Sequence, residues 1–186
     1  EKRSTIIYAS LVFSVGLLYH FFYYYVMARV EFDNYHQDKF VILSVPYIVL
    51  IIVFPILIYL LRTKYVQILK YVFLLSFLIP TVLADIVSYH FVGHYDGGNV
   101  GELFMVLFAP IFVNANFFWF AASGLVIKYL SVILVYPELL SRIIFPIALL
   151  AFVVFLGYLI LLRFIAYVKS FNSVYDQQFS SMVKGI

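Results

Sequence analysis

The sequence has no cysteine and few charged residues, and both absences narrow its chemistry. Without cysteine the chain forms no disulfide, thiolate metal site or iron–sulfur cluster, and it has no cysteine nucleophile. Only 11% of its 186 residues are charged and 66% are hydrophobic, whereas soluble domains have about 25% charged and about 45–50% apolar residues. The chain therefore lacks the polar surface of a soluble globule. Its composition predicts an all-α, polytopic transmembrane helical bundle.

Four apolar stretches are long enough to cross a membrane, because about 20 residues at about 1.5 Å per residue span a hydrocarbon layer of about 30 Å. They cover residues 5–28, 40–61, 65–91 and 143–162. A further stretch, residues 102–137, is interrupted only by Lys128 and is longer than one span requires. The number of helices in this last stretch decides the topology.

The basic residues predict the orientation, because cytoplasmic loops carry an excess of Lys and Arg. Basic residues precede the first span, lie between the second and third, and follow the last: Lys2, Arg3, Arg62, Lys64, Lys70, Arg163, Lys169 and Lys184. With both termini in the cytoplasm the number of crossings is even, so residues 102–137 cross twice and six spans result. Five spans, the alternative, would place the basic tail outside. We expect the hairpin to turn near Ser123 and Gly124, with Lys128 at the cytoplasmic edge.

The composition changes after Leu162, which divides the chain into a transmembrane domain, residues 1–163, and a cytoplasmic helix, residues 164–186. Spacings of four and three residues in this tail are typical of a parallel coiled coil and predict a homodimer. The positions are Phe164, Val168, Phe171, Tyr175, Gln178 and Met182. The alternative is an interfacial helix that lies on anionic lipid, with Lys169 and Lys184 toward the headgroups.

Ionisable side chains gather toward the predicted outer side, and a charge within a span usually faces a partner or water. We expect Asp85 and His20 to lie in the outer half of their spans and to form a sensing cluster with His90, His94 and Asp96. Histidine beside carboxylates suits a pH switch, because imidazole titrates near pH 6.5. His90, His94 and Asp96 are also the candidates for a divalent metal. The turn-forming glycines around them disfavour the ligand geometry, so we expect no metal site.

The sequence contains no nucleophile elbow, zinc-protease, Walker or dinucleotide-binding motif, which predicts a protein that is not an enzyme. His20 and His90 differ by about 14 Å in distance along their spans, so they do not suit haem, and we expect no cofactor. The net charge of +3 is accounted for by the basic rims of the spans, so we expect no nucleic-acid partner. Asn114 and Asn116 would bridge helices or bind a polar ligand.

The stretch from Glu102 to Tyr136, with Trp119-Phe120-Ala-Ala-Ser-Gly-Leu at its centre, resembles the paired late helices in membrane-embedded input regions of bacterial histidine kinases and diguanylate cyclases. A last span that runs into a helical linker, as residues 143–186 do, is similar to the way those regions join their output. The resemblance implies a sensor in the bacterial cytoplasmic membrane that relays an extracytoplasmic or intramembrane signal through its C-terminal helix.

Two other functions fit a bundle of this size. One is the substrate-binding membrane subunit of a small-molecule importer, with Asp85, Asn114 and Asn116 in its pocket and a transport protein as its partner. The other is a structural subunit of a larger membrane complex. In both alternatives the chain is embedded in the lipid bilayer.

Overall fold

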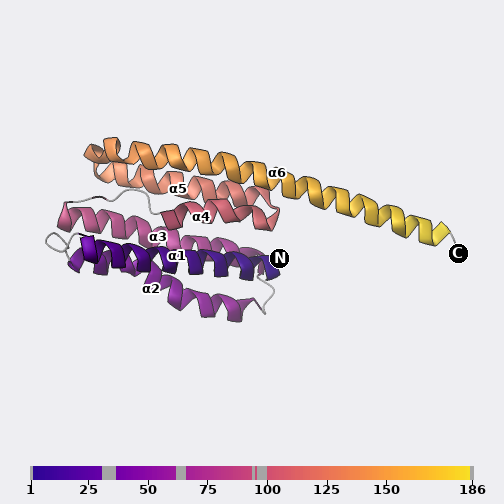
Figure 1. The fold of residues 1–186 in the computed structure, drawn as a ribbon, viewed down its shortest axis with the longest axis horizontal. Helices are drawn as coiled ribbons and strands as arrows, with labels where there is room; N and C mark the ends of the chain where they lie inside the picture. The colour runs from indigo at the N-terminus through magenta and orange to yellow at the C-terminus, as the bar shows by residue number, and fades with distance from the viewer. Residues whose placement is uncertain (1, 31–36, 62–65, 94, 96–99, 185–186) are drawn as a thin grey trace.

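A computed structural model describes residues 2–30, 37–61, 66–93, 95 and 100–184, and the part of the chain that it describes is helical, without a strand. Within these described residues, six α-helices follow one another (Figure 1). Their bounds are α1 Lys2–Val30, α2 Gln37–Leu60, α3 Val66–Val92, α4 Val100–Phe108, α5 Ala115–Val135 and α6 Leu140–Lys184, with short 3-10 helices at η1 Ala109–Phe112 and η2 Pro137–Leu139. The predicted all-α class is confirmed.

Four of these helices contain apolar segments long enough to cross a membrane: Lys2–Phe22, Gln67–Phe91, Ala115–Val135 and Pro137–Ser181. Two shorter apolar segments, Ser44–Leu60 and Gly101–Phe112, lie in α2 and in α4 with η1. Large apolar side chains are exposed along the bundle, among them Ile52, Leu83, Leu134 and Phe145. A surface of this kind suits lipid as solvent, which confirms the predicted transmembrane bundle. The exact number of spans stays a prediction.

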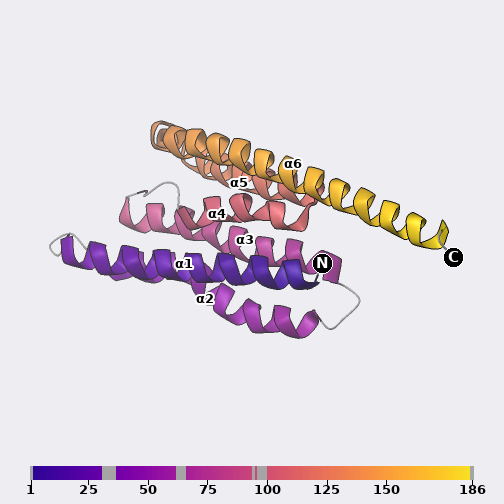
Figure 2. The same cartoon turned by 45° about the vertical axis from the view of Figure 1, so that its right-hand side comes forward.

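The helices lie side by side, and the N-terminus and the free part of α6 are at the same end (Figure 1). Contacts join α1 to α2, α3 and α4, and they join α6 to α4 and α5. The C-terminal part of α6 extends beyond the other helices in both views (Figures 1 and 2), and residues 166–181 are exposed along its length. One continuous helix therefore leads out of the bundle.

The hairpin turn between α4 and α5 lies at Val113 and Asn114, so the expectation of a turn near Ser123 and Gly124 is wrong. Val113 has a positive φ of 51°, and the side chain of Asn114 accepts a hydrogen bond of 3.0 Å from the backbone N–H of Phe117. This cap begins α5, as asparagine often does at a helix N-terminus. Ser123 instead bonds within α5 to the carbonyl of Phe120, and Gly124 packs closely on Leu78.

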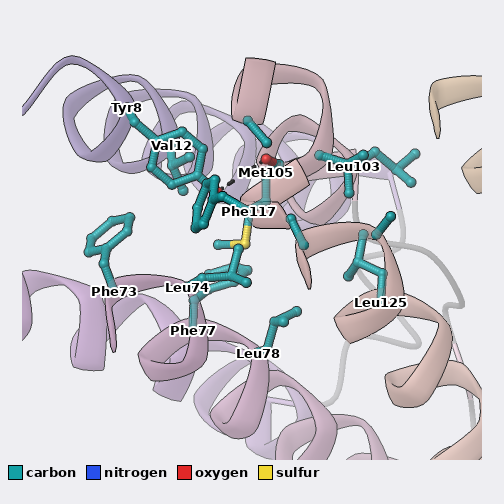
Figure 3. Close-up of a cluster of buried hydrophobic side chains, with 14 of the residues drawn as sticks. Tyr8, Val12, Phe73, Leu74, Phe77, Leu78, Leu103, Met105, Phe117 and Leu125 are labelled. Carbon is teal, nitrogen blue, oxygen red and sulfur yellow. Dashed lines mark hydrogen bonds between the residues drawn. The ribbon is translucent and has the colours of Figure 1, made fainter. Parts of the chain in front are cut away.

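Aromatic and aliphatic side chains of α1, α3, α4 and α5 meet in one part of the hydrophobic core (Figure 3). Tyr8 of α1 contacts the rings of Phe73, Phe112 and Phe117 edge to face. Its hydroxyl donates a 3.1 Å hydrogen bond to the carbonyl of Met105, which fixes α1 against α4. Because this core is continuous, a displacement of α4 or α5 meets resistance from α1 and α3.

Candidate functional site

Three charged side chains meet inside the bundle, one each from α3, α4 and α5. Lys128 and Glu102 are each 1% exposed and Asp85 is 17% exposed. The Lys128 ammonium lies 2.8 Å from Asp85 Oδ2 and also donates a hydrogen bond to Glu102 Oε1. We call these three residues the ion network. It ties three helices together through one lysine.

The positions of the three residues follow from the helices that carry them. Glu102 lies in the first turn of the short helix α4, where a carboxylate interacts favourably with the helix dipole. Lys128 lies about 20 Å along α5 from Ala115, by the helix rise, and therefore well inside this apolar helix. The expectation that Lys128 lies at a cytoplasmic edge is wrong, because α5 begins earlier than expected and carries the lysine into the bundle.

Further polar oxygens lie close to the ion network without a partner. Among the described residues, the buried side-chain atoms with no hydrogen-bond partner are Ser88 Oγ, Tyr95 Oη, Glu102 Oε2 and Tyr129 Oη. Tyr95 and Tyr129 both interact electrostatically with all three members of the ion network, and Ser88 follows Asp85 by one turn of α3. Unpaired buried polar groups are costly, and each calls for an explanation.

A second lysine, Lys70, is also buried, at 2% exposure, but its surroundings are aromatic. Its ammonium lies 4.9 Å from the centroid of the Phe112 ring and 5.5 Å from those of Tyr71 and Phe117. A cation above aromatic rings is stabilised by their negative faces. Lys70 therefore packs beside the α4–α5 turn, whereas Lys128 is held by carboxylates.

The predicted sensing residues do not form one cluster in the described part of the chain. His20 is half-buried, with Nε2 3.0 Å from Ser44 Oγ and its ring 4.3 Å from that of Tyr47, so its described contacts are with α2. His90 is exposed, and its Nδ1 lies 3.3 Å from the Tyr136 hydroxyl. Only Asp85, of the predicted set, belongs to the ion network.

The remaining predicted residues are placed elsewhere or lie outside the description. Asn114 caps α5 with its side-chain oxygen, and Asn116 is exposed in the first turn of the same helix. Asn114 is about 21 Å from Lys128 along α5, by the helix rise, so it does not share a pocket with the ion network. His94 and Asp96 lie outside the described residues, within which no group of three potential metal ligands occurs.

Sequence reasoning missed two members of the ion network, Lys128 and Glu102. Lys128 was expected at the cytoplasmic edge, because basic residues are enriched there, and Glu102 was not proposed as a site residue. A signal was present: Lys128 is a lone charge within a long apolar stretch, and an intramembrane charge usually has a partner of opposite sign. Asp85 was predicted in the outer half of its span, away from the predicted depth of Lys128, so the pair was not recognised.

One of the comparisons with known proteins identifies a family. The family model MASE12 matches residues 1–162, and MASE domains are membrane-associated sensor regions of signalling proteins. No curated protein and no solved structure matches the chain. The match covers α1 to α5 and ends within α6, before residues 166–181, which are all exposed.

Proposed function

This chain belongs to the MASE12 family of membrane-associated sensor regions, and on that premise we propose that it relays a signal from the ion network to a cytoplasmic output through α6. The observation that carries the proposal is the buried position of Lys128 between Asp85 and Glu102. A buried charge that loses its partner costs free energy. A change at one member of the ion network therefore favours a shift of the three helices that carry it. The module itself catalyses no reaction in this proposal.

The route from the ion network to α6 runs through close packing. Gly157 of α6 faces the ring of Phe118 on α5 and the carbonyl of Val106 on α4, and an added Cβ would lie 2.8 Å and 3.5 Å from these groups. Val106 follows Glu102 by one turn of α4. A displacement of α4 or α5 is therefore passed directly to α6, because tightly packed helices shift between discrete arrangements.

The length of α6 supports an output beyond the membrane. Its 45 residues span about 68 Å, more than twice a hydrocarbon layer of about 30 Å. We propose that this end, where Lys2 and Arg3 also lie, faces the cytoplasm of a bacterial cell. The exposed residues Phe164, Val168, Phe171 and Tyr175 form one stripe on the free part of α6; the side chain of Met182 lies outside the described residues. A second copy of the chain would pack against this stripe.

Cysteine cross-linking tests the relay, because the natural chain contains no cysteine. Tyr175→Cys should form a disulfide between two copies in membrane vesicles. Asp85→Asn should change the rate of this reaction several-fold, since it removes one partner of Lys128. Ser173→Cys is the matched control: it lies about 200° around the helix from Tyr175 and should cross-link weakly.

The same variant tests the orientation. An impermeant maleimide should label Tyr175→Cys in inside-out vesicles but not in intact cells. Equal cross-linking at positions 173 and 175, unchanged by Asp85→Asn, would contradict the relay. Labelling in intact cells would contradict the cytoplasmic position of this end.

A further inference from the structure

The ion network does not balance its own charge. Two carboxylates, Asp85 and Glu102, face one ammonium, Lys128, so the sum is −1 when all three are ionised. The charged groups that act on Glu102 among the described residues are Lys128 and Asp85 alone. A residual charge inside a membrane bundle is costly and usually has a partner. One further positive charge would make the fully ionised network neutral.

Three buried oxygen atoms without a hydrogen-bond partner belong to the ion network or to residues that interact with it. Glu102 Oε2 has no partner, although Glu102 is fully buried in the first turn of α4. The Tyr129 hydroxyl is also buried and unpaired, and its strongest charged neighbour is Glu102. Tyr95, which is 6% exposed between α3 and α4, has Asp85 as its strongest charged neighbour. The free oxygens thus come from different segments around one pair of carboxylates.

We infer that this cluster binds one monovalent cation in addition to the Lys128 ammonium, with Glu102 Oε2 and the hydroxyls of Tyr95 and Tyr129 as its ligands. The charge sum of −1 is cancelled by one positive charge, whereas a divalent ion would leave the site positive. Carboxylate and hydroxyl oxygens suit a hard cation. The proton and the alkali ions share this charge: an alkali ion would bind all three oxygens, whereas a proton would be carried by Glu102 Oε2 alone.

The bound cation would be the signal that the proposed sensor detects. Its role as a signal rests on the proposed function, whereas its binding to the ion network does not. The groups that interact electrostatically with Glu102 are Asp85 from α3, Tyr95 from the α3–α4 connection, and Lys128 and Tyr129 from α5. From α1, Tyr8 reaches the carbonyl of Met105, one turn farther along α4. None of these groups carries a second positive charge, so a bound cation would supply it.

Thermal unfolding of the purified full chain in detergent tests the binding. The melting temperature is measured in LiCl, NaCl and KCl against choline chloride of equal ionic strength, at several pH values from 5 to 9. A ligand that binds only the folded state raises the melting temperature. At a concentration hundredfold above Kd we expect a rise of about 5–10 °C for a chain of this size.

Two results would support the inference, and they identify the cation. A saturable rise with one alkali ion at fixed pH, lost in Glu102→Gln and weakened in Tyr129→Phe, assigns an alkali ion. No alkali effect, but a melting temperature that falls as the pH rises in the wild type and not in Glu102→Gln, assigns a proton, because the folded state then loses the proton it holds. Glu138→Gln, which removes an exposed carboxylate, should behave as the wild type.

The inference is overturned if the wild type responds neither to alkali ions nor to pH, or if Glu102→Gln responds as the wild type does. Should Glu102→Gln fail to fold, the wild type and Tyr129→Phe decide the same question, since Tyr129→Phe keeps every charge. If the cation binds but the cross-linking rate of Tyr175→Cys is the same with and without it, the cation site is supported. The proposed relay to α6 is then contradicted.

Discussion

Lys128→Met is expected to lower the free energy of unfolding by about 3–5 kcal/mol, because it leaves the buried Glu102 and the partly buried Asp85 without their shared partner. Methionine has a similar length and fills the same space, so the effect comes from the lost charge. Glu102, at 1% exposure, has no route to solvent that would relieve it. Unfolding of the detergent-solubilised protein, followed by circular dichroism against increasing SDS, measures the loss.

The matched control removes the charges together. The triple variant Asp85→Asn, Glu102→Gln, Lys128→Met has no net charge in the network, and replacing a whole buried ion group is often neutral or stabilising. We expect it to recover most of the stability that Lys128→Met loses. A Lys128→Met protein as stable as the wild type would show that the lysine does not hold the three helices.

Gly157→Val is expected to destabilise the bundle by about 1–3 kcal/mol, the usual cost of overpacking a core. The added atoms would meet the Phe118 ring, which is fully buried and contacts the rings of Trp119 and Tyr158, so the ring has little space to move aside. The backbone of α4 at Val106 blocks the other side. The melting temperature and the cross-linking rate at position 175 should both change.

Ala151→Val is the control for this substitution, because Ala151 lies on the exposed face of the same helix. It produces the same valine side chain by adding two methyl groups to an exposed alanine, and we expect wild-type stability and cross-linking. If Gly157→Val and Ala151→Val behaved alike, the contact between α6 and the bundle would not be tight enough to transmit movement.

The transmembrane bundle could be predicted from the sequence because lipid imposes a simple rule on composition and length. Helices need about 20 apolar residues to cross, and hydropathy detects such runs without knowledge of packing. The boundary between α4 and α5 could not be placed in this way. Ser123 and Gly124 are common turn residues, yet a membrane helix tolerates both, whereas the Asn114 cap determines where α5 begins.

The candidate site was predicted only in part, because its residues come from three helices and the sequence does not show which helices pack together. Asp85 was recognised because a lone carboxylate within a span is costly. Its partner Lys128 was assigned to a membrane edge once the turn had been placed ten residues too late. The prediction grouped His20 and His90 by depth, but depth does not specify the face of the bundle, and their described contacts are with Tyr47 and Tyr136.

The distance between α3 and the free part of α6 tests the central claim most directly, which is that the buried ion network controls the position of α6. Spin labels on cysteines introduced at Ile79 and Tyr167, both exposed, allow this distance to be measured by pulsed electron paramagnetic resonance in lipid nanodiscs. We predict that Glu102→Gln shifts or broadens the distance distribution, whereas Glu138→Gln leaves it unchanged. Superimposable distributions for the wild type, Glu102→Gln and Glu138→Gln would contradict the account.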